Sequence, residues 1–505
     1  MIRGDILLTS IAKKTTEEVF MKKIFSLFFN SYFLLLLLPF SFSTLAESNY
    51  YEKIKETREE VSDDVSKYVY DKIINRNLDE QRSKRDPNTQ FGLHGMEIPA
   101  INADGDIKKI DEVYSLLAHA GVDSLRSFET CWHRISDKNG NPNNFKQLDF
   151  QLQKAKEYDF SLLFVFGYPP AKFTVANNKL SAVNERFYNE YEHYLDVTLA
   201  RIKGHNVEYL ELANEVDAPA VWWINSTPAQ YVQEMKMLKE AINRSGENFK
   251  TVAFSATYSR NDSLGGGKGG RRFVDEAFRL GIDKYTDAYS IHHFVYPKDD
   301  LPNYIREEQK KFKLKSKPIF DTEQLDTSIE FQRDSNPYDM IKIFARAFFF
   351  YDMKRVDYFL AQDRFLNNRL YSSGLFDVNW KPKLRLLAYA MAVDSMKGKE
   401  LVGRYFPGNG IEAYILKENG KENNYSIVAW NNNKNDASTL TGVKGSVSVE
   451  KWNLDVENNV DAEKGIALDN KPIAIYTSQL PDWRLDDNER VIKNTLPSHA
   501  PMPFD

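Results

Sequence analysis

Two glutamates are the residues of this sequence best placed to do chemistry. Glu215 comes three positions after the strand-like run Val207–Leu212, and Glu323 directly follows the run Pro318–Thr322. A carboxyl group at the exit of a buried strand costs free energy unless it has a partner or a task. A pair of carboxyl groups suits the cleavage of a glycosidic bond, because one protonates the leaving oxygen while the other attacks the sugar or activates water.

Three further polar residues fall at comparable positions. Asn214 precedes Glu215, and Arg126 and His292 lie within or at the end of other apolar runs. We expect Arg126 to lie near Glu323 and to hold it ionised, whereas a partly apolar site would raise the pKa of Glu215 and keep it protonated. The two carboxyl groups would then be in opposite protonation states.

Eight short apolar runs alternate with eight helix-like segments between residues 91 and 398. The expected strands are Phe91–Met96, Ser124–Thr130, Ser161–Gly167, Val207–Leu212, Thr251–Ala256, Ala288–His292, Pro318–Thr322 and Val356–Ala361. The expected helices are Ile107–Ala120, Phe145–Tyr158, Glu185–Ile202, Ala229–Asn243, Arg272–Leu280, Tyr304–Phe312, Tyr338–Met353 and Pro382–Met396. This alternation predicts an α/β fold, a (β/α)₈ TIM barrel. A doubly wound open sheet is the alternative, but it would normally carry a dinucleotide or phosphate fingerprint after an early strand, and the sequence has none there.

A barrel would bring the two glutamates together. Active sites of TIM barrels lie at the C-terminal ends of the strands, where the βα loops converge. Glu215 follows the fourth expected strand and Glu323 the seventh. Since these strands are three apart around the barrel, both carboxyl groups can reach one ligand.

The chain is expected to divide into five segments. Residues 1–46 hold upstream residues and a signal peptide, 47–90 a charged helical linker, 91–398 the catalytic barrel, 399–480 an antiparallel β-sandwich domain, and 481–505 a polar tail. The sandwich is inferred from short alternating runs such as Ile411–Leu416 and Tyr425–Trp430, separated by turn-rich spacers.

The N-terminal segment has the pattern of a signal peptide. A charged start at Met21–Lys23 precedes apolar runs that end at Phe40, and small residues at Thr44 and Ala46 allow cleavage after Ala46. We therefore expect an exported protein, periplasmic or extracellular, with translation starting at either Met1 or Met21. A retained N-terminal anchor is the alternative, although the uninterrupted apolar run is short for a stable membrane span.

Composition narrows the classes of function. The net charge of −5 over 505 residues gives no reason to expect nucleic-acid binding. The single cysteine, Cys131, cannot form an internal disulfide, and its position at a strand end favours packing over catalysis. The eight histidines are scattered and form no metal-ligand pattern. We expect no cofactor and no metal, and a carbohydrate as the partner.

These residues together resemble clan A glycoside hydrolases, and family 39-like retaining β-glycosidases most. The clan ends strand 4 with an Asn-Glu pair and strand 7 with a glutamate, which match Asn214–Glu215 and Thr322–Glu323. Arg126 resembles the clan's arginine near the nucleophile, and Ser290–His292 its strand 6 histidine motif. The stretch from Ser373 to Pro382 is similar to one that follows strand 8 in the clan.

The resemblance implies a role for each matched residue. Glu215 is expected to be the acid/base, Glu323 the nucleophile of a retaining double displacement, and Asn214 the ligand of the sugar 2-hydroxyl. The clan usually offers a tyrosine just after the strand 6 histidine. This sequence has Phe294 there, so that either Tyr296 or His293 would have to take its place or the contact is missing.

Several aromatic and basic residues fall on the expected rim of the barrel. The candidates for sugar stacking are Trp132 after strand 2, Tyr168 after strand 3 and Trp222 after strand 4. A glycine-rich, basic stretch at residues 265–272 reads as a flexible lid rather than a phosphate loop, and its charges could meet an anionic sugar.

Three functions remain open at this stage. The first is a retaining glycoside hydrolase acting on an oligo- or polysaccharide. The second is a barrel that binds glycan without cutting it, which the presence of both glutamates disfavours. The third is another carboxylate-pair enzyme, such as a lyase or a transglycosylase in exopolysaccharide processing.

Overall fold

The computed structural model describes residues 61–96, 107–219, 222–257, 270–292, 301–324, 336–366, 369–433 and 438–483. Among these residues, no helix combines the length and the hydrophobicity that crossing a membrane requires. The signal-like segment and the polar tail from residue 484 onward lie outside the described residues.

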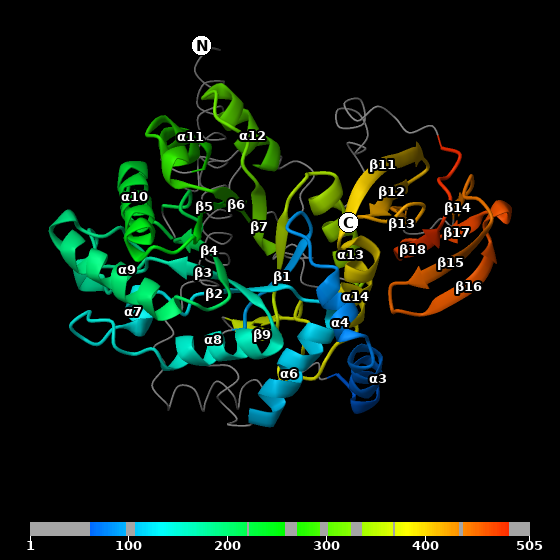
Figure 1. The fold of residues 1–505 in the computed structure, drawn as a ribbon, viewed down its shortest axis with the longest axis horizontal. Helices are drawn as coiled ribbons and strands as arrows, with labels where there is room; N and C mark the ends of the chain where they lie inside the picture. Colours follow the sequence, from blue (N-terminus) through cyan, green and yellow to red (C-terminus); the bar gives the residue numbers. More distant parts are fainter. Residues whose placement is uncertain are drawn as a thin grey trace, which may run out of the picture. The chain divides into compact units, whose positions relative to one another are not determined.

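Eight parallel strands close into a barrel in sequence order, β1 to β8 (Figure 1). They are β1 (Gln90–His94), β2 (Ser124–Ser127), β3 (Ser161–Phe166), β4 (Val207–Leu212), β5 (Lys250–Ala256), β6 (Ala288–Ile291), β7 (Ile319–Gln324) and β8 (Arg355–Phe359). The strands are buried nearly throughout, because helices cover the outside of the barrel and side chains fill its inside. The predicted TIM barrel is confirmed.

Eight main helices follow the eight strands. They are α6 (Ile107–Ala120), α8 (Lys146–Tyr158), α9 (Tyr188–Ile202), α10 (Pro228–Ser245), α11 (Arg271–Arg279), α12 (Leu301–Lys311), α13 (Asp339–Phe349) and α14 (Leu384–Met396). Helix α10 shows how the sequence sets such limits. Thr227 and Gln230 form a capping box at its start, and Gly246 ends it in a left-handed conformation with φ 71°.

Some predicted boundaries were wrong. The expected helix Glu185–Ile202 begins with a 3₁₀ turn, η2 (Glu185–Phe187), before α9. Helix α13 ends at Phe349 rather than at Met353. Strand β7 continues to Gln324, so Glu323 lies inside the strand and not after it.

One glycine of β1 is required by a buried ion pair inside the barrel. Arg355 and Asp357 of β8 are fully buried and form a two-point contact, with nitrogen–oxygen distances of 2.7 and 2.8 Å. A Cβ atom at Gly92 would lie 1.9 Å from Oδ1 of Asp357. Any larger residue at this position would therefore displace the carboxylate from its arginine.

The C-terminal region is an antiparallel β-structure, as predicted. A six-stranded sheet has the order β11–β12–β13–β18–β15–β16, and β14 pairs with β17 in a second sheet. The strands are β11 (Lys399–Gly408), β12 (Ile411–Glu418), β13 (Tyr425–Asn431), β14 (Ser438–Leu440), β15 (Ser446–Lys451), β16 (Val456–Asp461), β17 (Ile466–Leu468) and β18 (Ile473–Thr477). Apolar side chains from both sheets, among them Ile415, Leu440 and Leu468, share one buried core. The two sheets therefore pack as a small sandwich.

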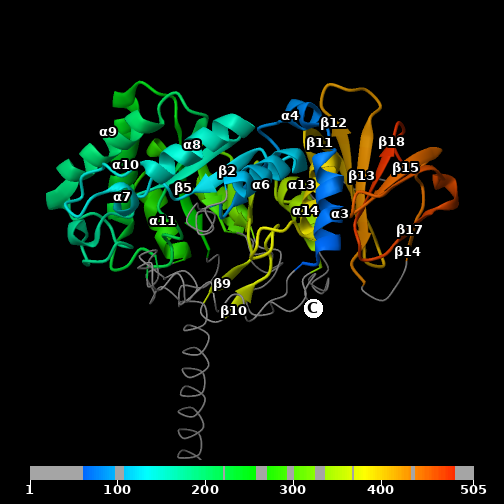
Figure 2. The same ribbon diagram turned by 90° about the horizontal axis from the view of Figure 1, so that it is seen from below.

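The opposite face of the large sheet packs on helices of the barrel (Figure 2). The guanidinium of Arg346 on α13 contacts the carboxylate of Glu412 on β12 at 2.7 Å. The hydroxyl of Ser426 on β13 donates to the carbonyl of Ser395 on α14 at 2.6 Å. Because β12 alternates sides, Glu412 faces the helices while Ala413 faces the sandwich core.

In the described part of the chain before β1 there are two short helices. Helix α3 (Asp63–Ile74) buries Val69 and Ile73, and α4 (Leu78–Ser83) follows it. Arg76, just after α3, donates to the carboxylate of Asp394 on α14. The segment from Asp63 to Ser83 is thus helical and docked on the barrel helices. Separately, β9 (Arg364–Leu366) and β10 (Arg369–Tyr371) form an antiparallel hairpin.

Candidate active site

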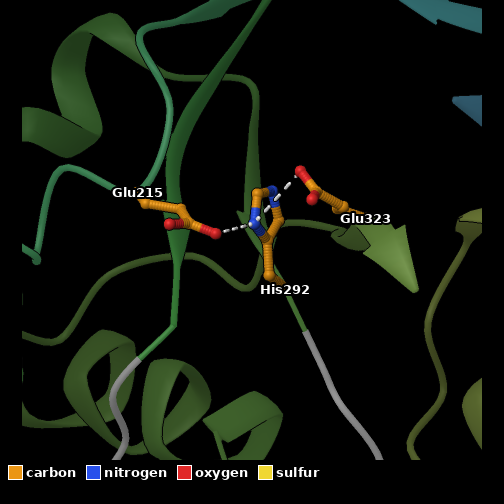
Figure 3. A group of neighbouring side chains, drawn as sticks. All are labelled: Glu215, His292 and Glu323. Atoms are coloured by element: carbon orange, nitrogen blue, oxygen red, sulfur yellow. Dashed lines mark hydrogen bonds and ion pairs between the residues drawn. The ribbon is translucent and has the colours of Figure 1, made fainter. Parts of the chain in front are cut away.

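Glu215 and Glu323 converge at the C-terminal end of the barrel. One carboxylate oxygen of each, together with a ring nitrogen of His292, lies in a group whose atoms are all within 4.8 Å of one another. Figure 3 shows the imidazole of His292 between the two carboxyl groups. The two acids and the imidazole therefore meet at one point of the site.

Both glutamates lie at irregular points of the backbone. Ala213 and Glu215, just after β4, have φ values of 58° and 49°, a left-handed conformation that costs non-glycine residues roughly 1 kcal/mol each. In β7 the pairing with β8 slips between Asp321 and Gln324, on either side of Glu323. Such irregularities re-aim side chains at strand ends and are common beside active sites.

Arg126 of β2 connects the groups around the two acids. Its guanidinium donates to Glu211 at 2.7 Å, to Asn214 at 2.7 Å and to Glu323 at 3.3 Å. Since arginine only donates, the Asn214 atom that faces it is the amide oxygen. This contact with Glu323 is the one that the sequence led us to expect.

Glu211 supports this arrangement from inside the barrel. It is fully buried on β4, and its second oxygen accepts a hydrogen bond from the hydroxyl of Thr322 at 3.0 Å. His94, at the end of β1, places Nδ1 3.3 Å from the guanidinium of Arg126 and 3.7 Å from the carboxylate of Glu323. Neither Glu211 nor His94 was among the predicted residues. The signals were present, since one is a charged residue within an apolar strand and the other a polar residue at a strand end.

His292 contacts both acids from the end of β6. Its Nδ1 lies 2.9 Å from Oε1 of Glu215 and 3.6 Å from Oε2 of Glu323. Burial, and then the charge of Arg126, lower the pKa of His292 well below its usual value, so the ring is neutral. The predicted substitutes for the clan's tyrosine, Tyr296 and His293, lie outside the described residues.

The environment of Glu215 favours its protonated form. Burial raises the pKa of Glu215 well above the usual value for a glutamate, and the charges of Glu323 and Asp217 raise it further. Arg126 opposes this shift but does not reverse it. Glu215 therefore suits a proton donor, whereas the direct contact with Arg126 belongs to Glu323.

The three clustered residues have the atom types of a metal site, but their surroundings oppose one. Glu215, His292 and Glu323 could each offer one ligand atom. The guanidinium of Arg126 already lies 3.3 Å from Glu323 and would repel a divalent cation placed there. The arrangement fits proton transfer and nucleophilic attack better than metal binding.

Aromatic rings line the rim between β2 and β4. Phe128, just after β2, stacks on His94 and on Tyr168, with ring centroids 5.5 and 6.1 Å apart. Tyr168 in turn meets Trp222 edge-on at 6.1 Å. Of these, Phe128 is only partly buried, and the sequence had not singled it out. The guanidinium groups of Arg126 and Arg134 also lie over its ring.

The prediction for Trp132 was wrong. Its ring is fully buried, stacked between Phe173 at 4.8 Å and Tyr194 at 5.2 Å, and its Nε1–H donates to the carbonyl of Gly140 at 2.8 Å. It anchors the loops after β2 and β3 and offers no face to a ligand. Cys131 beside it is also buried, which raises the pKa of its thiol to about 12 and makes it unreactive.

Comparison with known proteins finds similarity in structure only. No family model and no curated protein matches the sequence of this chain. Among solved structures, a family 39 glycoside hydrolase from Bacteroides cellulosilyticus superposes with a TM-score of 0.60 at 14% identity, covering 78% of this chain and 82% of that one. The chain has the fold of these hydrolases.

Two further structures agree with that result. A family 30 subfamily 8 xylanase from Clostridium acetobutylicum gives a TM-score of 0.55 at 15% identity, covering 77% of this chain and 95% of that one. A family 39 β-xylosidase from Caulobacter crescentus gives 0.54 at 12% identity, with coverages of 77% and 95%. At these identities the likeness establishes the barrel with its β-domain, and function has to be argued from the site.

Proposed function

We propose that this protein is a retaining glycoside hydrolase that cleaves O-glycosidic bonds of an oligo- or polysaccharide. The observation that carries the proposal is the closeness of two carboxyl groups in opposite environments. One carboxylate oxygen of Glu215 lies within 4.8 Å of one carboxylate oxygen of Glu323. Retaining enzymes place these groups about 5–5.5 Å apart, whereas inverting enzymes leave about 6.5–9.5 Å for a water molecule.

In the first step Glu323 is the nucleophile. Its carboxylate attacks the anomeric carbon, the bond to the leaving oxygen breaks, and Glu215 gives its proton to that oxygen. In the second step Glu215, now ionised, takes a proton from water. The water oxygen then attacks the anomeric carbon, and the bond to Glu323 breaks with the electrons returning to its carboxylate.

The neighbouring groups suit these two steps. Arg126 stabilises the ionised form of Glu323 before the first step and after the second. Asn214 turns its amide oxygen to Arg126, which leaves the NH₂ group to donate to a sugar hydroxyl such as the 2-hydroxyl. His292 is neutral, so its Nδ1 accepts from protonated Glu215 without competing for the charge.

The fold adds support of a general kind. The similar structures include a xylanase and a β-xylosidase, which act at this end of the same barrel type. We propose in addition that the protein is exported, on the basis of the signal-like residues 21–46. An enzyme outside the cytoplasm would meet polysaccharide substrates.

The stereochemistry of the first-formed sugar tests the proposal. A panel of aryl glycosides is offered to the wild type, and the anomer released from each substrate that turns over is followed by proton NMR. The wild type is expected to release the retained anomer. Glu323→Ala is expected to lose turnover, whereas the matched control Glu240→Ala, on the exposed face of α10, is expected to keep it. First-formed sugar of inverted configuration, or equal rates in Glu323→Ala and the control, would overturn the proposal.

A further inference from the structure

A second group of polar side chains lies on the loops after β2 and β3. It consists of Glu129, His133, Arg134 and Lys179, which we call the rim group. Glu129 is buried, whereas the other three are partly exposed. All four follow the C-terminal ends of their strands, the same end of the barrel that carries Glu215 and Glu323.

The loops that carry the rim group are tied together. The backbone N–H and the ring Nδ1 of His133 both lie within hydrogen-bond distance of the carbonyl of Tyr168, at 3.0 and 2.9 Å. Lys179 sits in a tight turn, in which the side chain of Asn178 accepts from the N–H of Leu180 at 2.9 Å. The group is therefore held in place before any ligand arrives.

The rim group carries a surplus of positive charge. Arg134 pairs with Glu129 at 3.4 Å. Among the residues that the structure describes, no carboxylate lies within ion-pair distance of the ammonium of Lys179. The whole chain has a net charge of −5, so the positive charge of the rim group is a local feature.

The titration behaviour of the group agrees with its geometry. Burial and the charge of Arg134 lower the pKa of Lys179. Burial, Lys179 and Arg134 lower the pKa of His133 to about 3, so its ring is neutral. Because a carbonyl only accepts, the proton of His133 is on Nδ1, and Nε2 is left as an acceptor for a sugar hydroxyl.

One aromatic ring separates the rim group from the catalytic acids. The guanidinium carbon of Arg134 lies 5.9 Å from the ring centroid of Phe128, and that of Arg126 lies 5.1 Å from the same centroid. Arg126 in turn contacts Glu323. Phe128 thus lies between the rim group and the arginine that contacts the nucleophile.

We propose that Lys179 and Arg134 bind an anionic substituent, a carboxylate or a sulfate ester, on a sugar unit next to the one that is attacked. This proposal rests on the proposed glycosidase function and names the substrate class, an acidic polysaccharide. A half-buried ammonium without a carboxylate partner costs free energy, and an anion on the substrate recovers that cost as a charge-assisted hydrogen bond. A neutral glycan would not offset the free energy of burying this ammonium.

Paired glycans test this substrate class. The probes are an oligosaccharide containing uronic acid with its carboxyl-reduced form, and a sulfated oligosaccharide with its desulfated form. Binding is measured by calorimetry on full-length protein carrying Glu323→Gln, so that the probes are not consumed. The acidic member of one pair is expected to bind about tenfold or more tightly than its neutral form, and the pair that shows the difference identifies the substituent.

Variants assign the effect to the rim group. Lys179→Gln should abolish the preference and Lys179→Arg should restore it. Lys172→Gln is the matched control, since Lys172 is exposed on the same loop and donates to the carbonyl of Lys138 instead. Equal binding within both pairs, or a preference that survives Lys179→Gln, would overturn the inference.

Hydrolysis by the wild type separates this inference from the proposed function. Preferential binding of an acidic glycan without turnover of any glycoside would refute the proposed hydrolase function but support anion binding by the rim group. Turnover of neutral glycans alone, with no acidic preference, would refute the rim group and leave the glycosidase standing.

Discussion

Two buried glutamates of this chain have opposite acid–base properties. Glu215 at the barrel end has a pKa raised well above the usual value, because burial and the neighbouring charge of Glu323 dominate. Glu412, between the barrel and the β-domain, has a lowered pKa although it is equally enclosed. Arg346, Tyr414 and Asn432 all donate to Glu412, at distances of 2.7 to 3.0 Å.

The difference shows that burial alone does not decide the state of a carboxyl group. Glu412 has as many donors as a carboxylate can use, so the charged form is stable and the residue holds two domains together. Glu215 has a neutral histidine at 2.9 Å and a second acid nearby, so the protonated form is favoured. A satisfied acid is structural, whereas an acid held in a costly environment is suited to proton transfer.

Replacing the proposed acid/base should change kcat more than any substitution around Glu412 changes activity or stability. Glu215→Ala is expected to reduce kcat on glycosides with poor leaving groups by roughly 10²–10⁴-fold, the usual contribution of a general acid. Glycosides with activated leaving groups need no proton, so their first step should be nearly unaffected. A plot of rate against leaving-group pKa for wild type and variant measures this, and a uniform loss across the series would refute the assigned role.

Breaking the Arg346–Glu412 pair should destabilise the fold and spare the chemistry. Arg346→Ala leaves Glu412 buried without its main partner, which costs about 3–5 kcal/mol. Thermal unfolding measures the loss, and kcat/KM at low temperature should stay close to wild type. Arg201→Ala, which removes an exposed pair with Asp149, is the control and should cost at most about 1 kcal/mol. Equal destabilisation by both variants would contradict the contrast.

The pH dependence of stability should differ in sign between the two glutamates. The raised pKa of Glu215 means that the folded state holds a proton that the unfolded state releases, so stability falls as the pH rises from the usual glutamate pKa toward the raised value. The lowered pKa of Glu412 contributes stability that is lost as the pH falls through its folded value.

Thermal midpoints measured across pH test this smaller effect. Glu215→Gln removes the titrating group at nearly constant shape, so it should raise the midpoint relative to wild type above the usual glutamate pKa and not below it. Glu234, whose burial raises its pKa to about 8, acts in the same direction and remains in both proteins. An offset between variant and wild type that does not depend on pH would contradict the pKa assigned to Glu215.

Much of this architecture was predictable because it repeats. The eight βα units and the change to short alternating strands after residue 399 follow from hydrophobic periodicity, and both are present in the structure. The convergence of Glu215 and Glu323 follows from barrel geometry once their strands are recognised. The predicted contact between Arg126 and Glu323 is also present.

Other features depend on tertiary contacts that a pattern does not contain. Trp132 follows a strand end like the other rim candidates, but the loops after β2 and β3 close over it and bury its ring. Phe128 follows Arg126 by two positions. Since residues two apart in a strand face the same side, this spacing could have marked Phe128 as facing the site. The slip in pairing around Glu323 is a property of the β7–β8 pair, so the sequence of β7 alone does not contain it.

Covalent trapping of the nucleophile tests the central claim most directly. A 2-deoxy-2-fluoro glycoside with an activated leaving group, of the sugar that the enzyme turns over, slows both steps and allows the glycosyl-enzyme to accumulate. Peptide mass spectrometry of the inactivated protein should then find one added sugar, on Glu323. A label on Glu215 or on any other residue would contradict the account. So would an unlabelled enzyme whose turnover persists in Glu323→Ala.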